Sequence, residues 1–171
     1  MTSLRGTRYE IDCALPGRLA TMAHPRGLTA LDDDMAALRA DGVDVVLSLQ
    51  TAEERAELGL TDESGAAQRA GMTYREMPIR DMSTPNLAVA GSTVDDIVAD
   101  LRAGRHVVVH CWAGIGRSST IAAAVLIRLG ASAADACETV SGARGMRVPE
   151  TQEQRAWLDE WAAACVDGFT A

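Results

Sequence analysis

The sequence predicts an α/β fold, a three-layer sandwich in which a central, mainly parallel sheet is flanked by helices. Short apolar segments typical of buried strands alternate along the chain with segments whose apolar residues recur at helical spacing. The chain has 171 residues, of which 47% are hydrophobic and 23% charged, as expected of one globular domain with a sizeable core. Because no repeat or linker interrupts it, we expect a single domain over residues 1–171.

The first half of the chain alternates strand signals with helix signals. In order, they are an edge strand over 9–15 that ends at Pro16-Gly17, its hairpin partner over 18–23, a helix with Leu31, Met35 and Leu38 on one face that stops near Gly42, a strand over 43–49, a short helix after it, a helix over 62–70 and a strand over 72–77. Thr51 and Glu54 match a capping box, so the short helix is expected to begin there.

The second half supplies longer helices and one further strand. In order, its elements are a loop over 78–85, a helix with the apolar stripe Val94, Ile97, Val98 and Leu101 that ends at Gly104, a strand over 106–109, a mostly buried helix over 117–129, a helix capped by Ser132 that reaches about residue 141, and a last helix with Pro149 at its first position. The last helix carries Trp157, Leu158 and Trp161 on one face, where we expect the tryptophans to pack in the core. Such sheets bind ligands beyond the carboxyl ends of their strands, so the loop after 106–109 is the expected site.

That loop contains a cysteine and an arginine, Cys111 and Arg117, which enclose five residues. The glycines among them tolerate positive φ, so backbone N–H groups can turn inward around an anion, and the following helix points its positive end at the same spot. Arg117 adds a planar guanidinium suited to bidentate contact with two phosphate oxygens. We therefore expect a sulfur nucleophile, Cys111, at the base of a phosphate-binding loop formed by Trp112, Ala113, Gly114, Ile115, Gly116 and Arg117.

Two neighbours are expected to support the nucleophile. The positive surroundings favour the thiolate form of Cys111, and Ser118 can donate a hydrogen bond to that thiolate and ease its later departure. His110, at the end of a buried strand, is expected to hold the loop through hydrogen bonds to backbone carbonyls. His24 and His106 have nothing catalytic beside them in the sequence, and we expect them to be surface or structural residues.

A thiolate that attacks phosphorus needs an acid to protonate the leaving oxygen, and Asp81 is the candidate. It lies thirty residues before Cys111, in a loop after a predicted strand, where a carboxyl group can swing over the site. Asp62, Asp95 and Asp96 are weaker rivals, since each falls on the start or the face of a predicted helix.

The motif His-Cys, five residues, Arg-Ser over 110–118 resembles the active-site signature of the cysteine-dependent protein tyrosine and dual-specificity phosphatases. Pro-Ile-x-Asp over 78–81, followed by Thr84-Pro85, is similar to the general-acid loop of the kinase-associated branch of the dual-specificity phosphatases. The segments 13–17 and 149–154 also have similar counterparts in that branch. The resemblance implies a protein tyrosine phosphatase-like fold.

The resemblance also implies that a glutamine in the last of these segments helps to place water. Gln154 matches that position best, and Gln152 is the rival. The loop residues Trp112, Ala113 and Ile115 are uncharged, which disfavours a polyphosphoinositide substrate, because phosphatases for such lipids tend to carry lysines there.

Composition excludes several other classes of function. The net charge of −8 and the pI near 4.8 argue against nucleic acid and anionic membranes as partners. The four cysteines, Cys13, Cys111, Cys137 and Cys165, show no metal-binding spacing, so neither metal nor cofactor is expected. The first residues lack the apolar core of a signal peptide and the run 121–127 is too short to span a bilayer, so we expect the protein in the reducing cytoplasm. We take a monomer as the default expectation.

These observations predict a protein phosphatase that hydrolyses phosphotyrosine through a cysteinyl-phosphate intermediate, with phosphoserine and phosphothreonine left open as substrates. One alternative is a pseudophosphatase that binds phosphoproteins without cleaving them, although the nucleophile, the arginine and the candidate acid are all present. Another is a sulfur-transfer or arsenate-reducing enzyme with a similar thiolate loop. Arsenate reduction usually needs a second cysteine within reach, and Cys137 and Cys165 fall on predicted helices with no clear route to the site.

Overall fold

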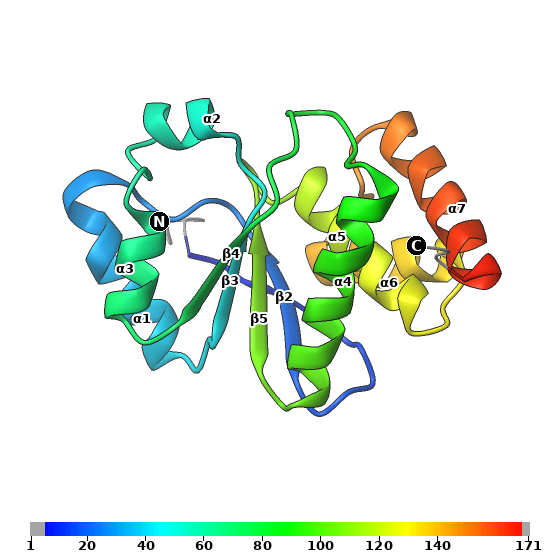
Figure 1. Ribbon diagram of the computed structural model, residues 1–171, viewed down its shortest axis with the longest axis horizontal. Coiled ribbons are helices and arrows are strands. Elements are labelled where there is room, and N and C mark those ends of the chain that lie inside the picture. The colour runs from blue at the N-terminus through cyan, green and yellow to red at the C-terminus, as the bar shows by residue number, and fades with distance from the viewer. Residues whose placement is uncertain (1–5, 169–171) are drawn as a thin grey trace.

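The computed structural model describes residues 6–168 and contains a five-stranded sheet in the order β1-β2-β5-β3-β4. The strands are β1 (Tyr9–Ile11), β2 (Arg18–Met22), β3 (Val45–Ser48), β4 (Thr73–Glu76) and β5 (His106–His110). The β2–β5, β5–β3 and β3–β4 pairs are parallel, and β1 pairs antiparallel with β2, as expected of a hairpin. The prediction of a mainly parallel sheet is confirmed (Figure 1).

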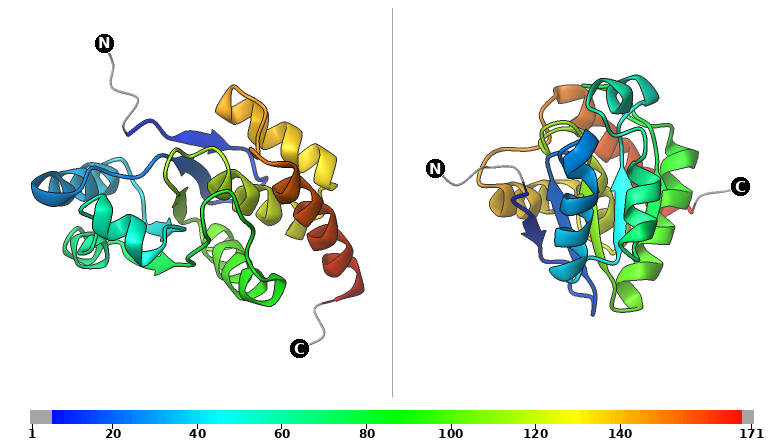
Figure 2. Two further views of the ribbon diagram at one scale, coloured as in Figure 1. Left: turned by 90° about the horizontal axis from the view of Figure 1, so that it is seen from above. Right: turned by 90° about the vertical axis from the view of Figure 1, so that its left-hand side faces the viewer.

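Helices cover both faces of the sheet. One layer contains α4 (Leu87–Arg102), α5 (Arg117–Arg128), α6 (Ala133–Arg144) and α7 (Gln152–Asp167); the other contains the short 3-10 turn η1 (Leu28–Ala30), α1 (Leu31–Ala40) and α3 (Glu63–Arg69). The short helix α2 (Ala52–Glu57) lies beyond the carboxyl end of β3. The view from above in Figure 2 shows the two layers on either side of the strands.

The strands are apolar on both faces because each face has its own helix layer. Val107 and Val109 of β5 point into the core beneath α4, α5 and α7, whereas Val108 between them packs against α1 and α3. Successive strand side chains point to opposite faces, so a continuous apolar run fills both cores. The same run places its next residues, the loop after β5, at the carboxyl edge of the sheet.

Several element boundaries differ from the sequence predictions. β1 ends at Ile11 and not at residue 15, so Cys13 lies in the turn before β2 and not in a strand. The start of the helix that contains Val94 was not predicted; it begins at Leu87, because the Asn86 side chain accepts hydrogen bonds from the backbone N–H groups of Ala88 and Val89. α6 continues past residue 141 to Arg144 and ends at Gly145, whose φ is +74°.

The prediction that Pro149 opens the last helix is wrong. Pro149 follows a cis peptide bond outside the helix, and Thr151 is the N-cap of α7. The Thr151 side chain accepts a hydrogen bond from the Gln154 backbone N–H, and Oε1 of Gln154 accepts one from the Thr151 backbone N–H, so a capping box fixes the start at Gln152. The apolar face of α7 is confirmed: Trp157 and Trp161 stack with ring centroids 5.4 Å apart and are buried.

The prediction about a signal peptide falls partly on residues 1–5, which lie outside the described residues. Between residues 6 and 168, no helix is long and apolar enough to cross a membrane. The apolar run 121–127 lies inside α5, where these side chains are buried in the core of the fold.

Candidate active site

A pocket of about 710 Å³ opens at the carboxyl edge of the sheet. Its wall is built from the start of α2, the loop after β4, the loop after β5 and the segment before α7. The predicted nucleophile Cys111, the predicted acid Asp81 and Arg117 all line this pocket. The structure therefore brings together residues that lie up to thirty-six positions apart in the sequence.

Cys111 is the first residue after β5, and its side chain is buried at 3% exposure. Its Sγ lies 3.4 Å from the Oγ of Ser118, which belongs to the first turn of α5. A strand end and a helix start thus hold the sulfur and the hydroxyl in contact, as the sequence predicted. When Cys111 is a thiolate, the Ser118 hydroxyl is the group that donates.

The loop between Cys111 and Arg117 uses its two glycines differently. Gly114 has φ of +69°, and a Cβ on it would lie 2.6 Å from the backbone carbonyl carbon of Met22. Gly116 does not adopt the positive φ expected for it, since its φ is −86°. Its missing side chain instead leaves room for Gln154, because a Cβ there would lie 3.0 Å from Nε2 of that residue.

The five enclosed residues do not all face the pocket. Trp112, Ala113 and Gly116 line it, whereas Gly114 packs against Met22 and Ile115 packs against the core. Arg144 of α6 donates from Nε to the Gly114 carbonyl at 3.0 Å and so ties the loop to the helix layer. Of the six residues predicted to bind phosphate, four therefore line the pocket: these three and Arg117.

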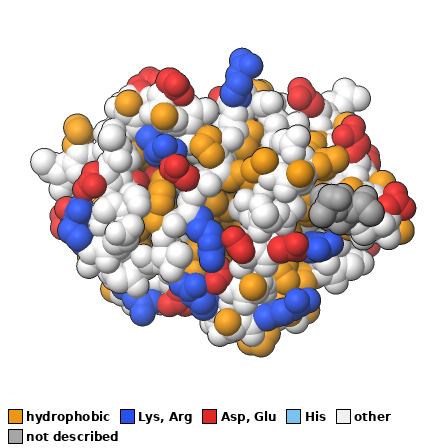
Figure 3. All heavy atoms as spheres, in the orientation of Figure 1, with side chains coloured by type: hydrophobic (Ala, Val, Ile, Leu, Met, Phe, Trp, Pro, Cys, Tyr) orange, Lys and Arg blue, Asp and Glu red, His pale blue; other side chains and the backbone are white. Residues whose placement is uncertain are grey.

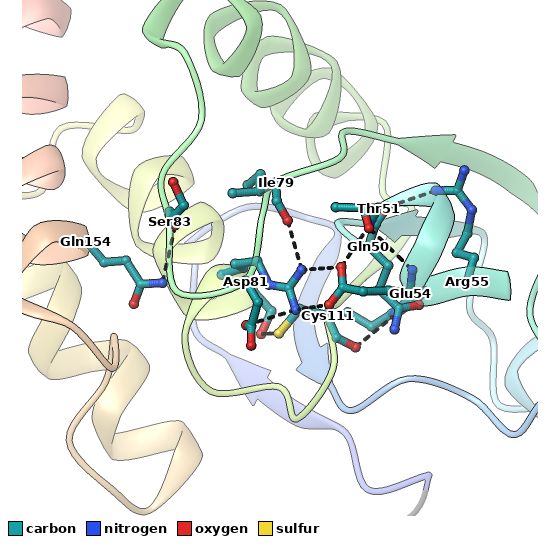
Figure 4. A network of polar contacts seen from close by, with 12 residues as sticks. Gln50, Thr51, Glu54, Arg55, Ile79, Asp81, Ser83, Cys111 and Gln154 are labelled. Carbon is teal, nitrogen blue, oxygen red and sulfur yellow. Dashed lines mark hydrogen bonds and ion pairs between the residues drawn. The ribbon is translucent and has the colours of Figure 1, made fainter. Parts of the chain in front are cut away.

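The Arg117 guanidinium is buried, at 1% side-chain exposure, and bonds to several acceptors. Figure 4 labels three residues of this network, Glu54, Ile79 and Asp81. Nη1 donates to Oε2 of Glu54 and to the Ile79 carbonyl, both at 2.8 Å, and Nη2 donates to Oε1 of Glu54 at 2.7 Å. Nη2 also lies 3.1 Å from Oδ1 of Asp81. Within residues 6–168, the buried Nε has no hydrogen-bond partner.

Glu54 is a site residue that the sequence analysis missed. The predicted capping box is present, with Thr51 as N-cap of α2. The same carboxylate, however, also forms the bidentate contact with Arg117, which is 63 residues away. Burial alone would raise the pKa of Glu54, but Arg117 and the Thr51 backbone N–H lower it, so the carboxylate stays charged. Burial would likewise lower the pKa of Arg117, and its contacts with Glu54, Cys111 and Asp81 raise it.

Asp81 lies in the loop after β4, with 65% of its side chain exposed. Next to it, Met82 has φ of +63°, an uncommon conformation for a residue with a side chain. The rival aspartates lie elsewhere: Asp62 bonds to Arg69, and Asp95 bonds to Arg128. Of these candidates, Asp81 is the one that lines the pocket.

His110 is fully buried and makes the contact predicted for it, with Nδ1 3.4 Å from the Cys111 carbonyl oxygen. The sequence analysis missed its second partner, Glu63 of α3, whose Oε1 lies 2.6 Å from Nε2. The Glu63 side chain is itself 1% exposed, and Tyr74 donates to its other oxygen at 3.5 Å. A buried carboxylate therefore holds the ring that touches the nucleophile's backbone.

The other two histidines, His24 and His106, were predicted to be surface or structural residues. His106 is buried, not on the surface, and desolvation lowers its pKa, so it serves a structural role at the start of β5. His24 is half-buried, and its ring lies edge-on to Trp112 with centroids 5.9 Å apart. It thus supports a side chain of the pocket wall.

Gln154 is fully buried and not an exposed helix residue. Its Oε1 accepts from the backbone N–H groups of Glu150 and Thr151, both at 3.1 Å, and its Nε2 donates to the Ser83 carbonyl at 3.4 Å. It therefore joins the start of α7 to the loop that carries Asp81. Gln152, the rival, is exposed on the first turn of α7.

The remaining cysteines lie away from the pocket. Cys137 and Cys165 are on α6 and α7, as predicted, and burial raises the pKa of each thiol. Cys13 is partly buried, with Sγ 3.9 Å from the Gly17 carbonyl, and all four cysteines are free thiols. In the described part of the chain, no group of three or more His, Cys, Asp and Glu residues is arranged to hold a metal ion.

Solved structures share this architecture. Kinase-associated phosphatase, in a form with its catalytic-site cysteine replaced by serine, has a TM-score of 0.87 at 20% identity, over 95% of this chain and 97% of the other. Tk-PTP in its active form has a TM-score of 0.76 at 26% identity, over 91% and 97% of the two chains. The likeness assigns the fold to the protein tyrosine phosphatase class.

Sequence comparison gives the family. Cyclin-dependent kinase inhibitor 3 from Rattus norvegicus and from Homo sapiens are each 25% identical to the chain over 151 residues, covering 87% of this chain and 69% of the relatives. A family model described as "Polymorphic toxin system, DSP-PTPase phosphatase" matches residues 20–131, well over half of the chain. The chain belongs to this family and, with it, to the dual-specificity phosphatase superfamily.

Proposed function

We propose that the protein is a cysteine-dependent protein phosphatase that hydrolyses phosphotyrosine, with phosphoserine and phosphothreonine as further substrates, through a cysteinyl-phosphate intermediate. The observation that carries the proposal is the convergence of Cys111, Arg117 and Asp81 in one pocket, with the Asp81 carboxyl 3.1 Å from Nη2 of Arg117. Membership in a phosphatase family supports the reaction type. The likeness to cyclin-dependent kinase inhibitor 3 supports a phosphoprotein substrate.

In the first step, the Cys111 thiolate attacks phosphorus and a sulfur–phosphorus bond forms as the bond to the leaving oxygen breaks. Asp81 gives its proton to that oxygen, so the substrate leaves as an alcohol or a phenol. The loop N–H groups and the Arg117 guanidinium stabilise the charge on the equatorial oxygens. The bidentate contact with Glu54 fixes the orientation of this guanidinium.

In the second step, the Asp81 carboxylate accepts a proton from water, and the water oxygen bonds to phosphorus as the sulfur–phosphorus bond breaks. The electron pair returns to the sulfur of Cys111, where the Ser118 hydroxyl, 3.4 Å away, donates to the departing thiolate. Gln154 acts here through position: it fixes the loop of Asp81 against α7 through the Ser83 carbonyl. A reducing compartment such as the cytoplasm keeps the thiol in the form that this chemistry needs.

The experiment that tests the proposal is acid quenching of the protein after brief mixing with an aryl phosphate, followed by mass analysis of the peptide that contains Cys111. A phosphorylated Cys111 peptide, accumulating further in an Asp81→Asn variant, supports the scheme. A Cys111 peptide that stays unmodified while phosphate is released contradicts it. Phosphate that binds with neither release nor modification indicates instead a binding module of the pseudophosphatase kind.

A further inference from the structure

The charge at the mouth of the pocket has the opposite sign to the one that a phosphate needs. Four carboxylates, those of Glu53, Glu54, Asp81 and Glu150, line the pocket together with two guanidiniums, those of Arg80 and Arg117. Glu54 and Arg117 already bond to each other, so the charge of this arginine is largely neutralised. An incoming phosphate therefore meets a site in which acidic side chains outnumber basic ones.

Positively charged and N–H groups at the bottom of the pocket can still bind the phosphate in spite of this charge. The Arg117 side chain is 99% buried, its Nε has no partner within residues 6–168, and the residue lines the pocket together with Cys111. The start of α5 and the loop N–H groups direct partial positive charge to the same point. The anion is thus held at the bottom of the pocket, and the acidic side chains act on the substrate residues that flank the phosphorylated one.

Two of these carboxylates come from opposite sides of the pocket. Glu53 is exposed in the first turn of α2. Hydrogen bonds from its own backbone N–H and from Thr51 lower its pKa, so it is charged at neutral pH. Glu150 precedes α7, and its Oε2 lies 3.1 Å from the point that a Cβ on Gly116 would occupy, against the phosphate loop. Figure 4 shows α2 and the start of α7 on either side of Cys111.

We propose that Glu53 and Glu150 select phosphoprotein substrates whose phosphorylated residue is flanked by lysine or arginine on both sides. This inference rests on the proposed phosphatase function and names its substrate class. A flanking cation neutralises a carboxylate that otherwise repels the phosphate, and a flanking acid adds to the repulsion. The net charge of −8 steers the approach in the same direction.

The size of the preference follows from the exposure of the groups. Ion pairs between exposed side chains change an equilibrium by about 1.5- to 5-fold each. With two carboxylates engaged, a lysine-flanked phosphopeptide should exceed its glutamate-flanked counterpart in kcat/KM by on the order of tenfold at low salt. The ratio should shrink as salt rises, because exposed charges are screened.

The test uses phosphotyrosine peptides that are identical except for lysine, glutamine or glutamate on both sides of the phosphorylated residue. Their kcat/KM values are compared at low and high salt for the full chain and for a Glu53→Gln, Glu150→Gln double variant. The matched control is Glu57→Gln, because Glu57 is exposed on α2 like Glu53 and does not line the pocket. We expect the lysine preference in the wild type and in the control, and a ratio close to one in the double variant.

Equal kcat/KM for the three peptides, a preference for glutamate, or a ratio that the double variant leaves unchanged would overturn the inference. Hydrolysis of p-nitrophenyl phosphate, which has no flanking residues, reports on the proposed function separately. If the wild type hydrolyses neither this ester nor the peptides, the phosphatase proposal has failed. The same comparison is then made on the dissociation constants of the peptides, where a lysine preference lost in the double variant supports the inference and its absence refutes it.

Discussion

Glutamine in place of Glu63 tests how the buried ring of His110 supports the nucleophile. The Cys111 carbonyl can only accept, so Nδ1 of His110 carries the proton of that contact. Nε2 of the same ring lies 2.6 Å from Oε1 of Glu63, and both side chains are shielded from water. Glu63→Gln keeps the shape of the side chain and removes its charge.

The magnitude follows from the burial of both partners. A hydrogen bond to a charged group contributes about 1.5–3 kcal/mol and a neutral one about 0.5–1.5 kcal/mol, so the variant should lose about 1–2 kcal/mol of unfolding free energy. In a domain of this size each kcal/mol lowers Tm by about 2–4 °C, which gives a drop of about 2–8 °C. The first residue of the phosphate loop is then held less firmly, and kcat should fall about 10- to 100-fold.

The assay combines thermal unfolding with kcat and KM for an aryl phosphate. Tyr74→Phe is the matched control, because it removes a weaker contact to the same carboxylate, 3.5 Å away, and leaves the contact with His110 intact. A His110→Asn variant and the double variant complete the cycle, and the loss of kcat in the double variant should be smaller than the product of the single losses. The reasoning fails if Glu63→Gln lowers Tm but retains the wild-type kcat, or if the two losses multiply.

Three further predictions concern the acid, the loop and the pH dependence of stability. Asp81→Asn should lower kcat by about 10²- to 10⁴-fold with little change in KM, and more for an alkyl than for a nitrophenyl phosphate; equal losses on both esters would contradict the role of an acid. Gly114→Ala should abolish phosphate binding measured by calorimetry, because the added Cβ would lie 2.6 Å from the Met22 backbone; wild-type affinity would refute this. The folded-state pKa of Glu54 is lowered, so its stabilisation is present above the ordinary value of 4.5 and lost as pH falls through the lowered value. A Glu54→Gln variant should therefore have a lower Tm at neutral pH and a flatter decline of Tm below pH 4.5, and parallel curves for the two proteins would contradict the assignment.

The parts of the site that are local in sequence could be predicted from it. Cys111, Arg117 and Ser118 lie within eight residues of one another, and a strand before them and a helix after them fix their arrangement. Asp81 could be placed because it follows a strand that ends at the same edge of the sheet. The acidic side chains that line the pocket lie at the same edge of the sheet. On the face of the molecule seen in Figure 1, Figure 3 shows acidic and basic side chains interspersed, with no basic patch.

The contacts that span the fold could not be predicted in the same way. Glu54 reads in the sequence as a capping residue and Glu63 as a first-turn acid of a short helix, and both are ordinary roles for glutamate. Their partners, Arg117 and His110, lie 63 and 47 positions away, so only the folded structure reveals the pairs. Their signal in the sequence is an acid in the first turn of a short helix, which is too common to select either residue.

The measurement that tests the central claim most directly is hydrolysis of p-nitrophenyl phosphate by the wild type and by a Cys111→Ser variant, with a chelator and a reductant present. Phosphate affinity of both proteins is measured alongside, to show that the loop is intact in the variant. The account predicts turnover by the wild type alone, with phosphate bound by both. Equal turnover by the Cys111→Ser protein would contradict a cysteinyl-phosphate mechanism.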